Sequence, residues 1–532
     1  MNPALALLDW LVIGGYLVFL VLFALWLARR QRDRADYYVG GRRLGAWPVA
    51  ISVMATQCST NSILGAPAFV AFAAGGGLVW LQYELALPLA MIVLILLVMP
   101  LFRQLQLVSV YAYLEHRFDL RTRLLLSALF QFARAFATAV TVFSIAIVID
   151  LILGIGFFWS VVILGVFTVV YDVLGGIRGV IYSDVIQMAI LVAVLGLLLA
   201  LLVQDNGGFA HMLDALDPAR RRALDFGHHG FGDGETFSFW PMLVGGLFLY
   251  LAYYGCDQSQ VQRLLCTRDI DTTNRALLIN GLLRFPLVAL YCLVGAGIAV
   301  YAAGSGDFLA RLPLHGGQPQ YNLAVPRYMI DTLPPGLVGL ALVALFAAAM
   351  SSLDSVINSL SATTMEDFVV RFCREPLSQR RELLLSRLIT VAWGVVTLTL
   401  SFFVGDIAPT VLEAINKIGS LANGPILAVF ALGLLSRRAS GVGACIGLLL
   451  GIAGNALLWR YAPGISWLWW NAIGFALTGL AGLLFSGGQA RPSVTDTARN
   501  ILREQSRVNW PLMCGLLATW FVLLFALLAS LG

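Results

Sequence analysis

A strip of oxygen-bearing side chains lies in a segment whose preceding dozen residues are apolar. Three hydroxyls and a carboxylate occur within five residues, at Ser351, Ser352, Asp354 and Ser355. At about 100° per helical residue, the three serines share one face with Ala348, and Asp354 lies at its edge. Hydroxyl, carboxylate and backbone oxygens are the ligands that hard cations prefer. The pattern therefore predicts a helix that binds a cation.

This helix must lie inside a membrane, because the chain is too apolar to be a soluble protein. Of its 532 residues, 59% are hydrophobic and only 12% are charged. Runs of about 20 apolar residues predict an all-α polytopic protein with about fourteen transmembrane helices in the lipid bilayer. We expect them at 9–29, 46–72, 80–101, 126–150, 156–176, 180–204, 239–262, 277–303, 334–362, 386–404, 410–436, 439–460, 466–487 and 511–531. Residues 1–532 form one transmembrane domain, with no soluble domain between the helices.

Arginines mark the loops that we expect on the inner side of the membrane. The first span is followed, not preceded, by basic residues, which is the reverse of a signal peptide. From there, every second loop is rich in arginine, as the positive-inside rule requires. This places both termini outside a cell membrane of the bacterial inner-membrane kind, although the outer loop at 205–238 also carries three arginines. These inner arginines explain the net charge of +5, which therefore does not suggest a nucleic-acid partner.

Two spans are interrupted by polar residues. The second contains the run from Thr56 to Ser62, and the seventh contains the run from Tyr253 to Gln260. Setting the first helix (9–29) aside, the breaks open two five-span halves, 46–204 and 239–436, followed by peripheral helices at 439–531. Paired broken spans mark the binding site in transporters built from inverted repeats, because unwound backbone frees carbonyls for a cation. The plainer alternative is that these hydroxyls bond to the preceding turn or to neighbouring helices.

Several motifs resemble the solute:sodium symporter family. Its inner-loop signature is similar to residues 36–42, its [ST]-D-V-[IF]-Q element to 183–187, and further elements to 258–263 and 351–367. The resemblance covers about 9–440 and includes the bacterial sialic-acid and galactose sodium symporters of this family. It implies the five-plus-five inverted repeat of LeuT, with an extra N-terminal helix and C-terminal helices. It also implies secondary active import of a small polar solute by alternating access, with Na⁺ as the coupling ion.

The resemblance implies two sets of sodium ligands. The main site of the family maps to the backbone carbonyls of Ala55, Cys58 and Ala348 and the hydroxyls of Ser351 and Ser352. The second site, found in sialic-acid symporters, maps to Asp184, Ser351, Asp354 and Ser355.

The carboxylate at position 354 departs from the family, in which a small or hydroxyl residue stands there. A charge at the bilayer centre costs on the order of 2.5–3.5 kcal/mol on insertion scales, so Asp354 needs a partner. It could hold a second sodium ion together with Asp184. Alternatively, one of these two like charges takes up a proton, which becomes a coupling ion. A third possibility is a hydrogen bond to Asn358, one helical turn further on.

The solute pocket is implied in the same way. Four positions match the pocket of sialic-acid symporters, in which the arginine binds the carboxylate: Ser59, Ser62, Gln82 and Arg134. Four others match the pocket of the galactose symporter: Glu84, Tyr253, Arg284 and Asn416. Because Arg134 lies well within its span, it needs an anionic ligand, or else a permanent pair with Glu84 or a route to the inner face. We predict a carboxylate-bearing sugar acid such as sialic acid, with neutral sugars, inositol and small monocarboxylates as rivals.

Other classes of protein fit the sequence poorly. An enzyme would need a nucleophile and a base at membrane depth, yet the chain has five histidines and neither a GxSxG nor an HExxH motif. A channel would use rings of charge or carbonyls from several subunits. The only lysine, Lys417, either adds to an anion site or lies in a wet vestibule. Trp467, Trp469 and Trp470 are expected to form an interfacial belt.

Overall fold

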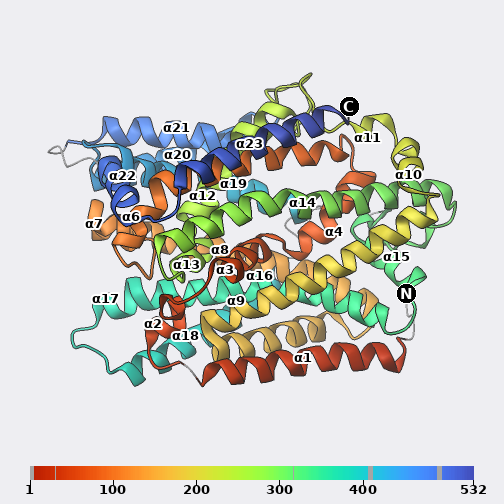
Figure 1. The fold of residues 1–532 in the computed structure, drawn as a ribbon, viewed down its shortest axis with the longest axis horizontal. Coiled ribbons are helices and arrows are strands. Elements are labelled where there is room, and N and C mark those ends of the chain that lie inside the picture. Colours follow the sequence, from red (N-terminus) through yellow and green to blue (C-terminus); the bar gives the residue numbers. More distant parts are fainter. Residues whose placement is uncertain (1–4, 30, 316, 405–410, 488–493, 532) are drawn as a thin grey trace.

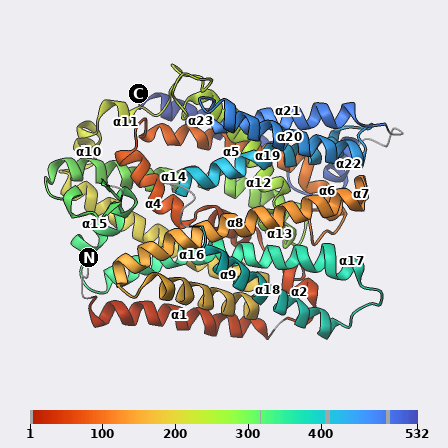
Figure 2. The same cartoon turned by 180° about the vertical axis from the view of Figure 1, so that it is seen from behind.

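Long helices that run side by side make up most of the molecule (Figures 1 and 2). This computed structural model describes residues 5–29, 31–315, 317–404, 411–487 and 494–531. The first part of the chain forms α1 (Leu7–Ala28), α2 (Arg34–Val39), η1 (Gly40–Arg42), α3 (Ala46–Gln57), α4 (Thr60–Phe72), η2 (Leu78–Leu85), α5 (Ala86–Val93), η3 (Leu94–Val98), α6 (Met99–Gln104), α7 (Ala112–Arg117), α8 (Leu120–Leu153) and α9 (Phe157–Asp205).

The middle of the chain begins with a long loop that contains two short helices. It forms α10 (Phe209–Ala215), α11 (Pro218–Arg221), η4 (Pro241–Gly245), α12 (Gly246–Cys256), α13 (Gln258–Leu265), α14 (Ile270–Gly304), η5 (Leu309–Arg311), η6 (Tyr321–Leu323) and α15 (Ala324–Thr332). A two-residue antiparallel hairpin, β1 (Leu314–His315) and β2 (Gln318–Pro319), interrupts this series, with Leu314 opposite Pro319.

The last part of the chain is helical again. It forms α16 (Leu337–Thr363), η7 (Thr364–Val369), α17 (Val370–Phe372), α18 (Gln379–Ser401), α19 (Val411–Leu435), α20 (Gly441–Tyr461), α21 (Trp467–Leu484), α22 (Val494–Gln505) and α23 (Trp510–Ala529). In the described part of the chain, ten helices are long and apolar enough to cross a membrane, and three shorter apolar helices occupy the remaining predicted spans. The all-α, multi-span expectation is confirmed, while the number fourteen stays a prediction.

Two of the predicted spans, 156–176 and 180–204, are joined without a loop in α9. The helix is interrupted only at Gly176, which has φ 54° and ψ −162°. A Cβ at this position would lie 2.9 Å from both the carbonyl oxygen and a ring carbon of Tyr37. Glycine is therefore required both by the backbone conformation and by the close approach of α2.

Aspartates start several helices at one end of the molecule. Asp33, Asp119 and Asp269 precede α2, α8 and α14, and each accepts a hydrogen bond from the backbone N–H three residues on, at 2.7–2.8 Å. A side chain that satisfies a free N–H in the first turn stabilises the helix start by about 1 kcal/mol. These caps fix where the helices leave the arginine-rich loops.

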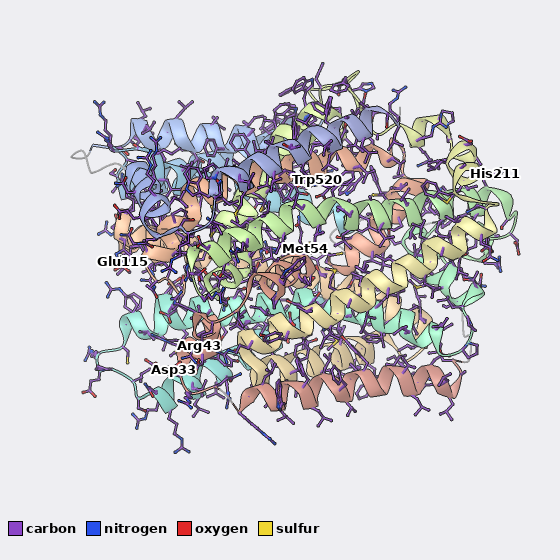
Figure 3. The ribbon with its side chains drawn as sticks, viewed as in Figure 1. Asp33, Arg43, Met54, Glu115, His211 and Trp520 are labelled. Carbon is purple, nitrogen blue, oxygen red and sulfur yellow. The ribbon has the colours of Figure 1, made fainter. Side chains whose placement is uncertain are left out.

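The predicted breaks are present in both half-chains. Helix α3 ends at Gln57, Cys58 and Ser59 have non-helical backbone angles, and α4 begins at Thr60. In the second half, α12 ends at Cys256, Asp257 is extended, and α13 follows directly. Met54, in the last turn of α3, lies near the middle of the long axis in Figure 3. The first break therefore lies close to the midplane of the bundle.

Helix α16 is the centre of the protein. Of its most apolar 18-residue window, 94% is buried inside the protein, compared with 33% for α1 and 22% for α23. Helix α16 packs against α9, α1 and α8. The oxygen strip thus faces other helices and not lipid, whereas α1, α18 and α23 present large apolar side chains outward.

The two ends of the bundle carry different loops. Asp33, Arg43 and Glu115 lie towards one end in Figure 3, and His211 lies at the other. Both termini lie at the end that carries α10, α11 and α15 (Figure 1). This arrangement agrees with an even number of membrane crossings.

Candidate functional site

A cavity of about 290 Å³ opens at the two broken helices. It is lined from α4, η2, α8, α12, α14, α16 and α19, which are distant in the sequence. Six of the eight predicted solute residues line it: Ser59, Ser62, Glu84, Arg134, Tyr253 and Arg284. Aromatic rings and polar groups alternate on its walls, as in pockets for small polar ligands.

The other two predicted solute residues are placed differently. Gln82 is fully buried and does not line this cavity. Its amide nitrogen donates to the carbonyl of Phe237 at 3.0 Å, and its amide oxygen accepts from the backbone of Asp225 at 3.1 Å. Gln82 therefore anchors the long loop in this structure. The side chain of Asn416 lies outside the described residues.

Some lining residues were not predicted. Asp257, Gln57, Thr138, Thr141, Asn423 and Trp467 all face the cavity. Asp257 and Gln57 belong to the polar breaks, which the sequence singled out without assigning these two side chains a role. Nothing in the pattern of α19 distinguishes Asn423 from other polar residues in membrane spans.

Arg134 forms an ion pair with Asp257. The Nε atom of Arg134 lies 2.5 Å from Oδ2 of Asp257, and its Nη2 atom contacts the same oxygen. The guanidinium also lies over the ring of Tyr253, 4.9 Å from its centroid. The alternative pair of Arg134 with Glu84 is absent, because Glu84 is paired with another arginine. The alternative route of Arg134 to the inner face stays a hypothesis.

Glu84 pairs with Arg284 instead. Their Oε2 and Nε atoms are 3.6 Å apart, and Tyr250 donates to the other carboxylate oxygen at 2.9 Å. Both charged side chains are almost completely buried. Among the described residues, Glu84 Oε2 and Arg284 Nε and Nη1 have no hydrogen-bond partner, and all three atoms are buried. A ligand would reach them only after a rearrangement of this pair.

A second, very small pocket lies between α3, α9 and α16. Ala55, Cys58, Ala348 and Ser351, four of the five residues predicted for the main sodium site, line it. The fifth, Ser352, lines the large cavity. Both serine hydroxyls donate to the carbonyl of Ala348, at 3.2 and 3.3 Å. Four of the five predicted residues thus line one pocket, and carbonyls in the last turn of a helix such as α3 lack an intrahelical donor.

Two of the four residues predicted for the second sodium site, Asp184 and Ser355, contact a buried arginine. Arg263 donates through Nε to Ser52 at 2.8 Å and through Nη2 to Ser355. Ser52 in turn donates to Asp184 at 2.5 Å. No part of Arg263 or Asp184 is exposed. The guanidinium therefore occupies a position between Asp184 and Ser355 that the sequence did not predict.

Asp354 makes different contacts from those expected of a helix-packing group. It accepts hydrogen bonds from the hydroxyl of Tyr171 and, at 3.1 Å, from Ser355. Asn358 donates instead to Asp172, at 2.9 Å. The predicted bond between Asp354 and Asn358 is therefore wrong, because the two side chains bind successive residues of α9. Among the described residues, Asp354 has no cationic partner within ion-pair distance.

The expectation of an interfacial tryptophan belt is wrong for two of the three residues. Trp467 and Trp470 are buried, at 4% and 2% exposure. Trp469 stacks on Phe231 and donates to the carbonyl of His229 at 2.8 Å. The long loop before α12 covers this end of α21, which the sequence pattern does not reveal.

A model of the sodium:solute symporter family matches residues 37–451, more than three quarters of the chain. The chain belongs to this family. It is 30% identical to the sodium/sialic acid symporter NanT of Aliivibrio fischeri over 481 residues, which cover 90% of this chain and 92% of the relative. It is 29% identical to the human sodium-coupled monocarboxylate transporter 1, covering 84% of this symporter and 72% of the human protein.

A solved structure agrees with this assignment. A Na⁺-coupled sialic acid symporter, in a substrate-bound outward-open state with a novel Na⁺ site, superposes with a TM-score of 0.82. The two chains are 25% identical, and the match covers 91% of this symporter and 99% of the solved one. The five-plus-five fold, sodium coupling and a transporter rather than an enzyme, all expected from the motifs, are thus confirmed for this multi-pass membrane protein.

Proposed function

We propose that this symporter imports a small solute that bears a carboxylate, with a sugar acid such as sialic acid as the first candidate. The observation that carries the proposal is Arg134 at the cavity wall. Its Nη1 atom has no acceptor among the described residues, so both N–H groups of that nitrogen remain for a ligand. Planar guanidinium groups suit the recognition of carboxylates. Two bacterial relatives named for sialic acid support the same class of solute.

The rest of the cavity suits the polyhydroxyl part of such a solute. Ser59, Ser62 and Tyr253 offer hydroxyls, and Glu84 and Arg284 add a carboxylate and a guanidinium to the lining. A buried polar group without a partner costs about 1–3 kcal/mol, which a ligand hydroxyl would recover in a conformation that exposes the partnerless atoms of this pair. Gln82 would join the proposed site only in a conformation in which its amide leaves the long loop. Asn416 stays in the proposed site as predicted.

A neutral sugar or inositol is the second candidate. It is favoured by the balance of charge at the walls, where each of Arg134 and Arg284 is already paired with a carboxylate. Such a ligand would need no free cation. A small monocarboxylate, as named for the human relative, would leave most of these hydroxyl partners unused.

We propose that one sodium ion binds in the small pocket. Its ligands would be the backbone carbonyls of Ala55, Cys58 and Ala348 and the hydroxyls of Ser351 and Ser352, which provide five oxygens. A second cation would bind at Asp184, Ser351, Asp354 and Ser355. Binding there requires that Arg263 give up its bond to Ser355, so this site is the weaker of the two proposals.

We further propose that the protein lies in a bacterial inner membrane with both termini outside. The arginine-rich loops, from Arg34 in α2 to Arg371 in α17, would then face the cytoplasm, as the positive-inside rule predicts. The halves 46–204 and 239–436 would move relative to each other, while 9–29 and 439–531 stay at the periphery.

Uptake by purified protein in proteoliposomes tests the proposed solute. With an inward sodium gradient, labelled N-acetylneuraminate should accumulate, and the unlabelled compound should compete. Substitution R134A should abolish this uptake, because the proposed guanidinium anchor for the carboxylate is lost. Accumulation of a neutral sugar that R134A leaves unchanged would move the protein to the second candidate.

A further inference from the structure

We infer that Asp257 is a tethered competitor for the carboxylate of the solute. This inference rests on the proposed function, since it assumes that Arg134 is the anchor for that carboxylate. It assigns Asp257 a role in specificity: the solute must compete for the charge of the arginine with a carboxylate that the protein itself supplies. Nothing in the family motifs around this position assigns such a role.

The two carboxylate oxygens of Asp257 accept hydrogen bonds from different groups. Oδ1 caps α13, accepting from the backbone N–H of Ser259 at 2.9 Å and from its hydroxyl at 2.6 Å. Oδ2 accepts both Nε and Nη2 of Arg134. Because the cap needs only one oxygen, Oδ2 can lose the arginine without loss of the helix start.

The arginine is held on one side and open on another. Tyr253 covers one face of the guanidinium, and Asp257 takes two of its three nitrogens. The side chains of Arg134 and Asp257 are 25% and 14% exposed, and both line the cavity. A solute carboxylate can therefore bind the remaining Nη1/Nη2 edge at once, but there it meets a guanidinium whose charge Asp257 already neutralises. It gains the Nε/Nη2 edge and the full charge of the arginine only when Asp257 withdraws.

Displacing Asp257 leaves a carboxylate oxygen in the cavity without its cation. A desolvated charge that loses its partner is strongly unfavourable, so the exchange costs free energy unless the ligand replaces the arginine. A hydroxyl or N–H close to the carboxylate of the solute can donate to Oδ2 and offset that loss. The pair therefore selects a carboxylate with a neighbouring hydrogen-bond donor, as in hydroxy acids and sugar acids, over a plain monocarboxylate.

Substitution D257N isolates the charge, because asparagine keeps an acceptor for the α13 cap while losing the negative charge. The matched control is E84Q, which neutralises the other carboxylate of the same cavity but leaves Arg134 paired. Both changes are made in the full-length carrier.

The first measurement does not depend on any solute. Purified carrier is treated with phenylglyoxal, and the adduct at Arg134 is quantified by peptide mass spectrometry. D257N should speed modification about threefold or more, as expected for loss of a partly exposed ion pair, while E84Q should not. An unchanged rate in D257N would overturn the inference.

The second measurement uses calorimetric titration with N-acetylneuraminate and with propionate. D257N should tighten binding of both about threefold to tenfold, with the larger gain for propionate, which has no donor to offer Asp257. Weaker binding of both acids to D257N would overturn the inference. If the wild-type carrier binds neither acid, the proposed function fails, and the modification rate alone decides whether Asp257 holds Arg134.

Discussion

The guanidinium of Arg263 lies 3.6 Å from the carboxylate of Asp184, and solvent reaches neither side chain. Arg263 also joins Ser52 of α3 to Ser355 of α16. A single side chain of α13 therefore ties together three helices that surround the proposed cation sites. The Arg263–Asp184 pair should therefore affect both the stability of the fold and the binding of cations.

Removing the charge of Arg263 should destabilise the carrier. R263M leaves Asp184 buried without a cation, and breaking a buried pair in this way costs about 3–5 kcal/mol. We expect the apparent melting temperature of the purified protein to fall. The double variant R263M/D184N should recover much of this loss, because no unpaired charge remains. If R263M melts at the wild-type temperature, the pair does not stabilise the fold.

Asp354 should contribute to ion coupling. Its only hydrogen-bond donors in the described chain are the hydroxyls of Tyr171 and Ser355, so D354A removes a buried carboxylate that has no guanidinium partner. We expect uptake to depend less steeply on sodium concentration. An unchanged Hill slope would exclude Asp354 from coupling.

A control variant and a pH measurement show whether the effect of D354A is specific and which ion is coupled. D172N, which removes another fully buried carboxylate of the same region, serves as the matched control. A pH-sensitive dye trapped inside the proteoliposomes separates a coupled proton from a second sodium ion, because only the former acidifies the lumen during uptake.

The hydroxyls of Ser351 and Ser352 should set the affinity for sodium. Loss of one oxygen ligand to a cation, at about 1.5–3 kcal/mol for a hydrogen bond to a charged group, corresponds to at least about a tenfold weaker apparent affinity in S351A or S352A. The apparent affinity is measured from the dependence of uptake on sodium concentration. S359A is the control, because this hydroxyl is on the same helix and donates to the Val356 carbonyl at 2.8 Å. If all three variants weaken the apparent sodium affinity equally, Ser351 and Ser352 are not specific sodium ligands.

The turn in α9 should not tolerate a side chain. G176A adds a Cβ 2.9 Å from the Tyr37 carbonyl oxygen and keeps a φ of 54°. Strained backbone of this kind costs about 1–3 kcal/mol. We expect a lower apparent melting temperature, whereas G196A, at a helical glycine with no atom within 4 Å of the added Cβ, should melt like the wild type.

Those parts of the fold that depend on periodicity were predictable from sequence. Hydrophobic runs located the spans, and the polar runs from Thr56 and Tyr253 located both breaks. Four of the five residues predicted for the main sodium site also line one small pocket between α3, α9 and α16, and the binding of sodium there stays a prediction.

The ion pairs formed by charged side chains across the cavity were not predictable from the sequence. Arg134 was weighed against Glu84, yet it pairs with Asp257, because the choice depends on how α8 and α12 are rotated about their axes. Spacing along one helix carries no information on that rotation. Burial of Trp467 escaped prediction for a related reason, since the covering loop is remote in sequence and has no periodic pattern.

Helix α13 has only eight residues, yet it contacts both the proposed solute site and the proposed cation sites. Asp257 at its start holds the proposed solute anchor, and Arg263, six residues on and about 9 Å along the axis, holds Asp184 and Ser355. Two helical turns are short enough to move as one body. Thermodynamic linkage is reciprocal, so if a solute shifts α13 and thereby changes the affinity for a cation, that cation must change the affinity for the solute by the same factor.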